Sequence, residues 1–412
     1  MTPRAASVTF ATVLAAALIV RVVLVLAVPF GPGVEQRLEG LNDEPAHYNY
    51  VKYLAEHRSF PVQTGHVRQP GAFERGDFEY YQPPLYYLIC APLYALAGEP
   101  RGLYACRMVS LACGLLSLMV LARILALLDC PLASRRLGVA FLALLPTHAY
   151  FSALVSNDCM SWFIDLLLVH ELLGLLNRAR AGAEAIAFRT HARIGMVIAA
   201  GMLSKSAIAV AFPMVLFAYG YLAWRARDTG CLSGLWIAFG LPLLLAGPWY
   251  ARSLALYGSP FALDVGFGPA EPGRTSFHSI YHTIGSTIRY FWFPMGHIHS
   301  SPAVQALRSV GGTLVLIHAV AVIGYFRRPG TVRAGSVMLW LLLAVMLVGH
   351  LRLNLMWGEA EGRFLFPALA AIVFLFVQPV FAFSQRWRAG EALVWTWVCL
   401  AAVHPWVLLA FA

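Results

Sequence analysis

"VTFATVLAAALIVRVVLVLAVP" (residues 8–29) is the stretch that decides the fold, and its only charged residue is Arg21. A helix needs about 20 predominantly apolar residues to cross the hydrocarbon core of a bilayer. Apolar side chains occur all around this run rather than on one stripe. The run is also too long for the apolar part of a cleaved signal peptide. It therefore predicts a membrane-spanning helix that acts as an uncleaved signal-anchor.

Similar apolar runs recur along the chain of 412 residues, which is 59% hydrophobic and 12% charged. The charged fraction is about half that of a typical soluble protein. Spans in lipid must satisfy their own backbone hydrogen bonds, so the sequence predicts an all-α polytopic membrane protein. The net charge of +10 comes from arginine clusters between apolar runs, so no nucleic-acid partner is predicted. The seven cysteines are scattered without a CxxC pair, which argues against a disulfide framework or a zinc knuckle.

The arginine clusters also predict the topology. Arg4 precedes the first run, so the N-terminus is expected in the cytoplasm. The segment 83–98 is short and is expected to lie against or dip into the membrane, because a full crossing would place nearly all arginine clusters outside. About eleven spans are then predicted, at 8–29, 102–127, 137–153, 160–176, 194–204, 207–223, 233–250, 305–326, 335–351, 362–384 and 391–411.

The sequence predicts a single membrane domain over residues 1–412 with no separate soluble domain. Residues 30–100 form a first extracytoplasmic loop carrying juxtamembrane helices, and residues 251–303 form a second. The second loop is amphipathic and rich in aromatic residues. Such a segment either anchors the protein at headgroup height or roofs a cleft that is open to lipid.

Polar residues gather on the predicted outer face. Ionisable groups near the hydrocarbon cost about 2.5–3.5 kcal/mol each on insertion scales, so a convergent set predicts a functional site. The segments are "NDEPAH" (42–47), "EYYQPPLYY" (79–87), "SNDC" (156–159), "LSKS" (203–206), "FHSIYH" (277–282), "GHIH" (296–299) and "WGEAEGRF" (357–364).

Two acidic segments begin predicted helices. Asp43 and Glu44 precede a helical pattern, so they either cap that helix or supply an ionised carboxylate that accepts a proton from a hydroxyl. Asp158 begins the next acidic span and either complements the helix dipole or serves as a second acid of the site.

Two cations break the apolar background. Lys205 lies between two apolar segments, where it either snorkels to the surface or binds an anion. Arg363 begins a later span beside Glu359 and Glu361, which either neutralise it structurally or leave it for a substrate. Both cations are candidate anion-binding residues.

Histidines of the second loop are candidate metal ligands. His278 and His282 are four residues apart on a plausible helix, with His297 and His299 nearby. This spacing suits a metal, but four histidines among aromatic residues are more often part of an amphipathic helix. No metal is assigned from the sequence, and a divalent ion is left open as a cofactor.

Seven short stretches in order resemble the GT-C superfamily of membrane glycosyltransferases, in particular the family-39-like, protein-mannosyltransferase and aminoarabinose-transferase types. They are "NDEPAHYNYVKYLAE" (42–56), "YQPPLYYLICAPLYALAG" (81–98), "CRMVSLACGLLSLMVLARIL" (106–125), "VSNDCMSWF" (155–163), "AGMLSKSAI" (200–208), "ARSLALYGSP" (251–260) and "EGRFLFPALAAI" (361–372). The resemblance implies a GT-C-like helical bundle in the bacterial cell (inner) membrane with an extracytoplasmic active site.

The resemblance also implies an activity. Members of this superfamily transfer a sugar from a polyprenyl-phosphate carrier to an acceptor hydroxyl and invert the anomeric centre. Carried over to this chain, Asp43 is the base with Glu44 beside it, Asp158 is the second acid, and Lys205 and Arg363 contact the lipid phosphate. The same motifs contribute the substrate-binding candidates His47, Tyr81, Gln82 and Tyr257.

Departures from the family pattern limit the analogy. Gln82 stands where relatives often have a charged residue, and Phe364 replaces a tyrosine. A lipid or glycan acceptor is expected rather than a peptide, since no soluble domain is predicted. Two alternatives remain: a transporter or flippase of a lipid-linked sugar, and a polymer ligase that uses a lipid-diphosphate glycan.

Overall fold

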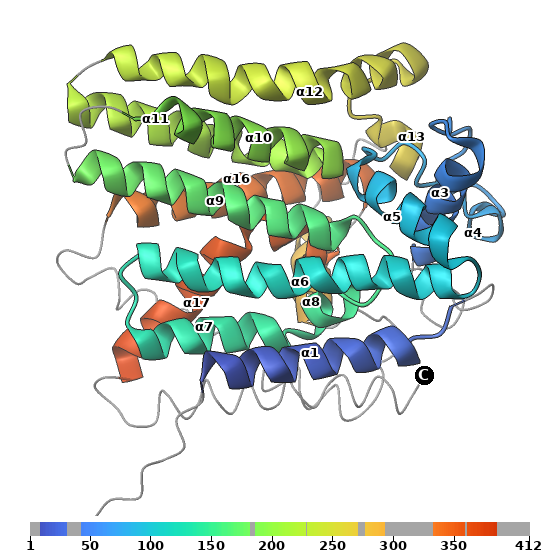
Figure 1. Cartoon of the computed structure of the whole chain (residues 1–412), viewed down its shortest axis with the longest axis horizontal. Coiled ribbons are helices and arrows are strands. Elements are labelled where there is room, and N and C mark those ends of the chain that lie inside the picture. Colours follow the sequence, from blue (N-terminus) through green and yellow to red (C-terminus); the bar gives the residue numbers. More distant parts are fainter. Residues whose placement is uncertain are drawn as a thin grey trace, which may run out of the picture.

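Long apolar helices that lie side by side form the body of the protein (Figure 1). The computed structural model describes residues 9–30, 43–181, 186–227, 229–270, 277–292, 333–358 and 361–384, and no strand occurs among them. The body consists of α1 (Phe10–Ala27), α6 (Arg101–Leu127), α7 (Leu132–Leu144), α9 (Asp158–Arg180), α10 (Phe188–Ser204), α11 (Phe212–Ala226), α12 (Gly234–Tyr257), α16 (Ala334–Trp357) and α17 (Leu369–Ser384).

Seven stretches of helix in the described residues are long and apolar enough to cross a membrane. They are Phe10–Ala27, Arg101–Leu127, Asp158–Arg180, Ser206–Ala226, Gly230–Tyr257, Ala334–Trp357 and Gly362–Pro379. The protein is therefore a multi-pass membrane protein, and the all-α class predicted from the sequence is confirmed. The predicted spans 305–326 and 391–411 lie outside the described residues, so the total of about eleven spans stays a prediction.

The predicted span 137–153 is wrong as a continuous helix. The chain forms α7, bends at Leu145, and continues as the short α8 (Pro146–Phe151). Pro146 lacks an N–H and disfavours helical dihedrals in the residue before it, and Leu145 is accordingly extended with ψ 114°. The predicted pair 194–204 and 207–223 matches α10 and the 3-10 segment η1 (Ser206–Ala211) running into α11, with Lys205 extended between them.

The first loop forms short helices at one end of the bundle, on the right in Figure 1. They are α3 (Glu44–His57), α4 (Ala72–Arg75) and α5 (Leu85–Ala97), and α13 (Leu263–Phe267) from the second loop lies with them. With 13 residues, α5 is too short to cross a bilayer, in line with the prediction for 83–98. This group of short helices is called the loop end below.

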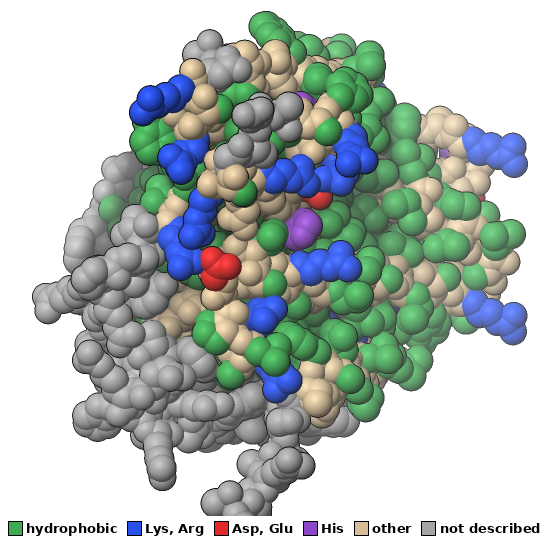
Figure 2. Space-filling model, turned by 60° about the vertical axis from the view of Figure 1, so that its left-hand side comes forward, with side chains coloured by type: hydrophobic (Ala, Val, Ile, Leu, Met, Phe, Trp, Pro, Cys, Tyr) green, Lys and Arg blue, Asp and Glu red, His purple; other side chains and the backbone are tan. Residues whose placement is uncertain are grey.

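The other end of the bundle is rich in arginine (Figure 2). Helices α6, α9 and α11 end there, and α7 and α16 begin there. The arginines in or next to these helix ends are Arg135, Arg136, Arg178, Arg180, Arg225, Arg227 and Arg333. Positive residues collect in short cytoplasmic loops, so we expect this arginine-rich end to face the cytoplasm and the loop end to face outward.

Arg21 lies in the middle of α1 and is completely buried. Its guanidinium donates hydrogen bonds to the carbonyls of Ala17 and Ala143, at 3.1 and 2.9 Å, and lies 2.8 Å from Nδ1 of His148. A guanidinium away from water needs such partners because an unsatisfied buried donor is costly. Arg21 thus ties α1 to α7 and α8.

Helix α14 (Phe277–Trp292) from the second loop packs against α16 and against η4 (Gly362–Ala368). His350 of α16 lies 2.7 Å from the hydroxyl of Thr287 on α14. A Cβ atom at Gly362 would lie 2.2 Å from the backbone nitrogen of Phe291 and 2.4 Å from the carbonyl of Thr287. Only glycine permits so close an approach of the two backbones.

We expect Gly362→Ala to lower the free energy of unfolding by about 1–3 kcal/mol, the usual cost of overpacking, because both clashing atoms belong to rigid backbone. The apparent melting temperature of the purified protein in detergent measures this. Gly349→Ala in α16 is the matched control, since the nearest neighbouring atom lies 4.0 Å from its Cβ position. Equal melting temperatures for the two variants would show that the packing of α14 does not require glycine at position 362.

Candidate active site

A cavity of about 400 Å³ opens at the loop end of the bundle. Its polar lining comes from segments that are far apart in sequence: Asp43, His47, Glu79, Tyr81, Gln82, Asp158, Ser161, Lys205, Ser206, His350, Arg352 and Arg363. The structure therefore brings together seven residues that the sequence singled out. Trp162, Phe267 and Phe364 are among the apolar residues that complete the wall.

Arg363 is the centre of an ion-pair network in this cavity. One terminal nitrogen lies 3.0 Å from Oδ2 of Asp43, and the other lies 3.1 Å from Oδ2 of Asp158. Its Nε pairs with Glu361, and Lys205 pairs with the other oxygen of Asp158. Buried charges are stable only when such partners are present, and both cations of the network are paired with carboxylates of the protein.

Helix ends place the two acids. Asp43 is the N-cap residue of α3, and Asp158 is the first residue of α9. The side chain of Asp43 makes no capping hydrogen bond, so the capping alternative does not account for it. Its carboxylate turns into the cavity instead.

Asp43 is ionised in this setting. Burial alone would raise its pKa, but the charges of Arg363 and His47 outweigh burial and hold the pKa of Asp43 well below its usual range. Its Oδ1 atom is buried and accepts no hydrogen bond from the described residues. A carboxylate with a low pKa is always charged, yet it is a weak base for as long as Arg363 stays paired with it.

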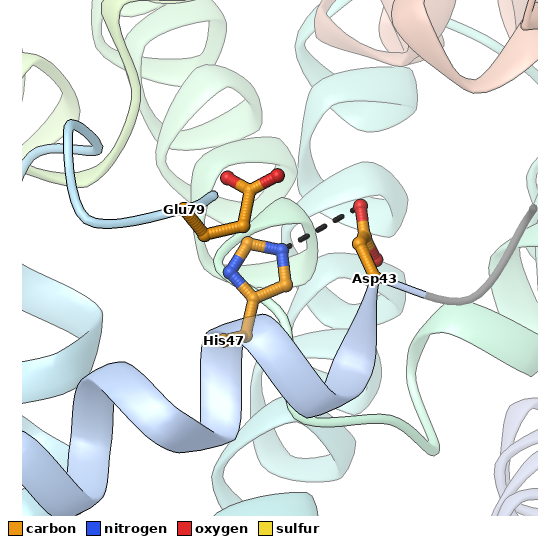
Figure 3. Close-up of side chains that lie close together, drawn as sticks. All are labelled: Asp43, His47 and Glu79. Atoms are coloured by element: carbon orange, nitrogen blue, oxygen red, sulfur yellow. Dashed lines mark ion pairs between the residues drawn. The ribbon is translucent and has the colours of Figure 1, made fainter. Parts of the chain in front are cut away.

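His47 lies between Asp43 and Glu79 (Figure 3). Its Nε2 is 3.6 Å from Oδ2 of Asp43, and its Nδ1 is 2.7 Å from the hydroxyl of Tyr87. Burial opposes the charge on His47, but Glu79 and Asp43 raise its pKa above the ordinary value. Burial raises the pKa of Glu79 as well. The ligand atoms of these three side chains lie within 4.8 Å of one another, close enough to hold one metal ion.

Of the predicted metal candidates on α14, His282 does not join this group. His282 is exposed, and Asp43, His47 and Glu79 form the one such cluster among the described residues. Of His278, only the backbone belongs to the described part of the chain, and His297 and His299 lie outside it. The structure thus offers a separate candidate metal site, on α3 and the loop before α5, and the metal hypothesis for α14 stays a prediction.

Glu44 does not line the cavity. It is completely buried, and both of its oxygens pair with Arg107, at 2.8 and 2.6 Å. One of them also accepts the backbone N–H of Val155 at 2.7 Å. Arg107 further donates to the carbonyls of Val25 and Val28 at the end of α1. With its lone pairs used in this way, Glu44 joins α3 to α6, and we replace its predicted catalytic role with a positioning role.

Tyr257 also lies outside the cavity lining. Its hydroxyl accepts a hydrogen bond from the backbone of Gln63 at 3.0 Å. The side-chain oxygen of Gln63 accepts one from the backbone of Tyr81 at 3.1 Å. Tyr257 therefore supports the wall that carries Tyr81, and its predicted role in substrate binding stays a prediction.

Sequence reasoning did not single out Glu79 or Arg352. Glu79 begins the segment "EYYQPPLYY" (79–87), which was interpreted from its aromatic residues and its pair of prolines. Arg352 lies just beyond the predicted span 335–351 and is the only charged side chain of "GHLRLNLMW" (349–357). In each case the usable signal is an ionisable residue at the outer end of an apolar segment.

No protein-family model matches the sequence, and no curated protein matches it. Solved structures do resemble it. ArnT from Cupriavidus metallidurans bound to undecaprenyl phosphate has 15% sequence identity and a TM-score of 0.56, and the match covers 92% of this chain and 61% of that one. Archaeoglobus fulgidus oligosaccharyltransferase in complex with Zn and sulfate has 15% identity and a TM-score of 0.53, over 97% of this chain and 52% of that one.

A further structure of the archaeal enzyme, AglB from Archaeoglobus fulgidus with an inhibitory peptide and a dolichol-phosphate, gives a TM-score of 0.54 at 15% identity. The match covers 97% of this chain and 55% of that one. The chain thus spans between about half and three fifths of the length of these proteins. It has the GT-C fold of membrane glycosyltransferases, as the sequence resemblance predicted.

Proposed function

We propose that the protein is an inverting glycosyltransferase that moves a sugar from a polyprenyl-phosphate carrier to an acceptor hydroxyl on the extracytoplasmic face. The observation that supports this most is the meeting of Asp43, Asp158, Lys205 and Arg363 in one cavity of a GT-C fold. The neighbours crystallised with undecaprenyl phosphate and dolichol-phosphate support a lipid-phosphate donor. The acceptor is a lipid or a glycan.

The chemistry requires cations more than it requires a strong acid. The bond between the anomeric carbon and the phosphate oxygen breaks as the acceptor oxygen attacks from the opposite face, and the phosphate leaves as an anion. Lys205 and Arg363 stabilise that developing charge. Asp43 receives the proton of the acceptor hydroxyl.

Arg363 couples the two halves of this reaction. In the structure it holds Asp43 and Asp158 together. When the donor phosphate binds, Arg363 turns from Asp43 to the phosphate, and the freed carboxylate becomes a stronger base. The base is thus activated only when the donor is present.

Arg352 is the cation that first attracts the donor. It lines the cavity, and no carboxylate of the described residues pairs with it. Lys205 and Arg363, by contrast, are already neutralised. An arginine without a carboxylate partner offers its full fork of donors to a phosphate.

We expect Arg352→Gln to raise the apparent KM for the lipid-phosphate donor about tenfold or more, the value of one charge-assisted hydrogen bond, with kcat changed much less. Steady-state transfer rates at varied donor concentration give both constants. Arg101→Gln is the matched control, an exposed arginine of the same end of the bundle that does not line the cavity. A loss in kcat at unchanged KM would contradict this role.

A divalent metal ion fits beside the base. The archaeal neighbour was crystallised with Zn, and Asp43, His47 and Glu79 supply the nitrogen and oxygen ligands that such ions accept. Oδ1 of Asp43 and Oε2 of Glu79 are buried and lack a hydrogen-bond partner in the described part of the chain. His47 is held through Nδ1 by Tyr87, which leaves Nε2 for a metal. A bound ion would add positive charge next to the leaving phosphate.

One assay separates this proposal from its alternatives. Purified protein in detergent is given a labelled polyprenyl-phosphate sugar and a mixture of lipid and glycan acceptors. Transfer or hydrolysis of the label supports the glycosyltransferase. Turnover of lipid-diphosphate glycan alone supports the polymer ligase. Movement across proteoliposomes without any reaction supports a transporter, although a transporter places its charges near the bilayer midplane, and here they gather at the loop end.

A further inference from the structure

A second cavity, of about 590 Å³, lies at the arginine-rich end of the bundle. Its lining comes from the last turns of α6, α9 and α11, the first turn of α16 and the inner face of α17. The catalytic cavity lies at the loop end, so the two have no lining residue in common. Nothing in the proposed glycosyl transfer uses this second cavity.

Its rim carries an excess of positive charge. Arg180, Arg225 and Arg333 line it together with one carboxylate, that of Asp129. Asp129 pairs with Arg333 and lies 3.7 Å from Arg180. In the part of the chain that the structure describes, Arg225 has no carboxylate partner. One carboxylate facing three guanidinium groups leaves a net attraction for an anion.

Its lining between the helices is mixed in polarity. Leu173 and Leu176 of α9 and Phe374 of α17 lie there with the polar side chains of Asn177 and Gln378. Tyr221 and Trp224 flank the cavity from α11, and Trp224 is 71% exposed. Aromatic residues of this kind mark the headgroup level of a membrane. The cavity thus combines a cationic rim with a lining of both polar and apolar side chains.

We propose that this cavity binds the phosphate headgroup of an anionic phospholipid. Arginine pairs with phosphate through two parallel hydrogen bonds, and basic pockets between helices on the cytoplasmic side of membrane proteins take acidic lipid headgroups. Arginines in this region also set the topology. Topology alone, however, requires no arrangement around a cavity, whereas these three arginines, from three different elements, surround one.

Lipid binding to the full-length protein in neutral detergent tests this inference. The probes are phosphatidylglycerol, phosphatidylcholine and inorganic phosphate, and the readout is native mass spectrometry together with the apparent melting temperature. We expect the wild type to bind phosphatidylglycerol about tenfold or more tightly than phosphatidylcholine. In Arg225→Gln/Arg333→Gln this preference should fall to about twofold or less, and in Arg225→Lys/Arg333→Lys it should fall to an intermediate value, because lysine keeps the charge but not the paired hydrogen bonds of arginine.

The matched control is Arg189→Gln/Arg227→Gln, which removes two arginines of the same end that do not line the cavity. It should keep the wild-type preference. If it loses as much as the cavity variant, the charge of the whole end is responsible and the proposed site is overturned. Equal binding of phosphatidylcholine and phosphatidylglycerol by the wild type overturns it as well. Inorganic phosphate alone, if it stabilises the wild type but not Arg225→Gln/Arg333→Gln, identifies a free phosphate as the ligand and overturns the lipid assignment.

Discussion

An Asp43→Asn enzyme is expected to transfer sugar about 10²–10⁴-fold more slowly than the wild type, which is the usual contribution of a general base. Asparagine preserves the shape of the side chain and removes its ability to accept a proton. It also releases Arg363 from its 3.0 Å pair with this carboxylate. Donor affinity should therefore stay unchanged or increase, and the whole loss should appear in kcat.

Transfer rates under donor saturation and donor binding in the absence of acceptor measure the two effects separately. Asp264→Asn, on the exposed surface of α13 at the same end of the bundle, should behave like the wild type. Normal turnover by Asp43→Asn would remove this residue from the base position. A loss of donor binding with unchanged kcat would instead make Asp43 a binding residue.

Glu44→Gln is expected to lower the free energy of unfolding by about 3–5 kcal/mol, the cost of leaving one charge of a buried ion pair without its partner. The substitution keeps the size of the side chain but leaves the guanidinium of Arg107 uncompensated, with only 1% of it exposed. The pair joins α3 to α6, so the base itself loses its support. A large drop in apparent melting temperature in detergent measures the effect.

Two further variants separate positioning from catalysis at Glu44. Glu56→Gln removes an exposed carboxylate from the same helix and should change stability by no more than about 0.5 kcal/mol. Glu44→Gln/Arg107→Met removes both charges and should recover much of the lost stability. If Glu44→Gln melted like the wild type but lost activity, the catalytic role predicted from the sequence would be right after all.

Most of the charged residues of the cavity were predictable because each interrupts an apolar background, whereas Glu79 and Arg352 were overlooked. Asp158 and Lys205 lie at the outer ends of predicted spans, so the topology alone brought them to one side of the membrane. Their pairing with one another, and the central place of Arg363 between two acids, depend on side-chain directions that no sequence spacing specifies.

The partner of Glu44 was not predictable in the same way. Arg107 lies within the predicted span 102–127, and nothing in the sequence distinguishes it from the other polar residues of that span. Two adjacent acids at a helix start look equivalent in sequence, but one residue along a helix turns the side chain by about 100°. Asp43 consequently faces the cavity and Glu44 faces α6.

The pairing of Arg363 with carboxylates of the protein has a consequence for which donor the proposed enzyme accepts. Arg363 is already satisfied by carboxylates of the protein itself, so an uncharged polyprenol has nothing to offer in their place. Only a molecule that carries its own negative charge can compete with Asp43 for the guanidinium of Arg363. If the proposed function holds, Arg363 therefore adds to Arg352 a second means of discriminating a phosphorylated carrier from its dephosphorylated alcohol.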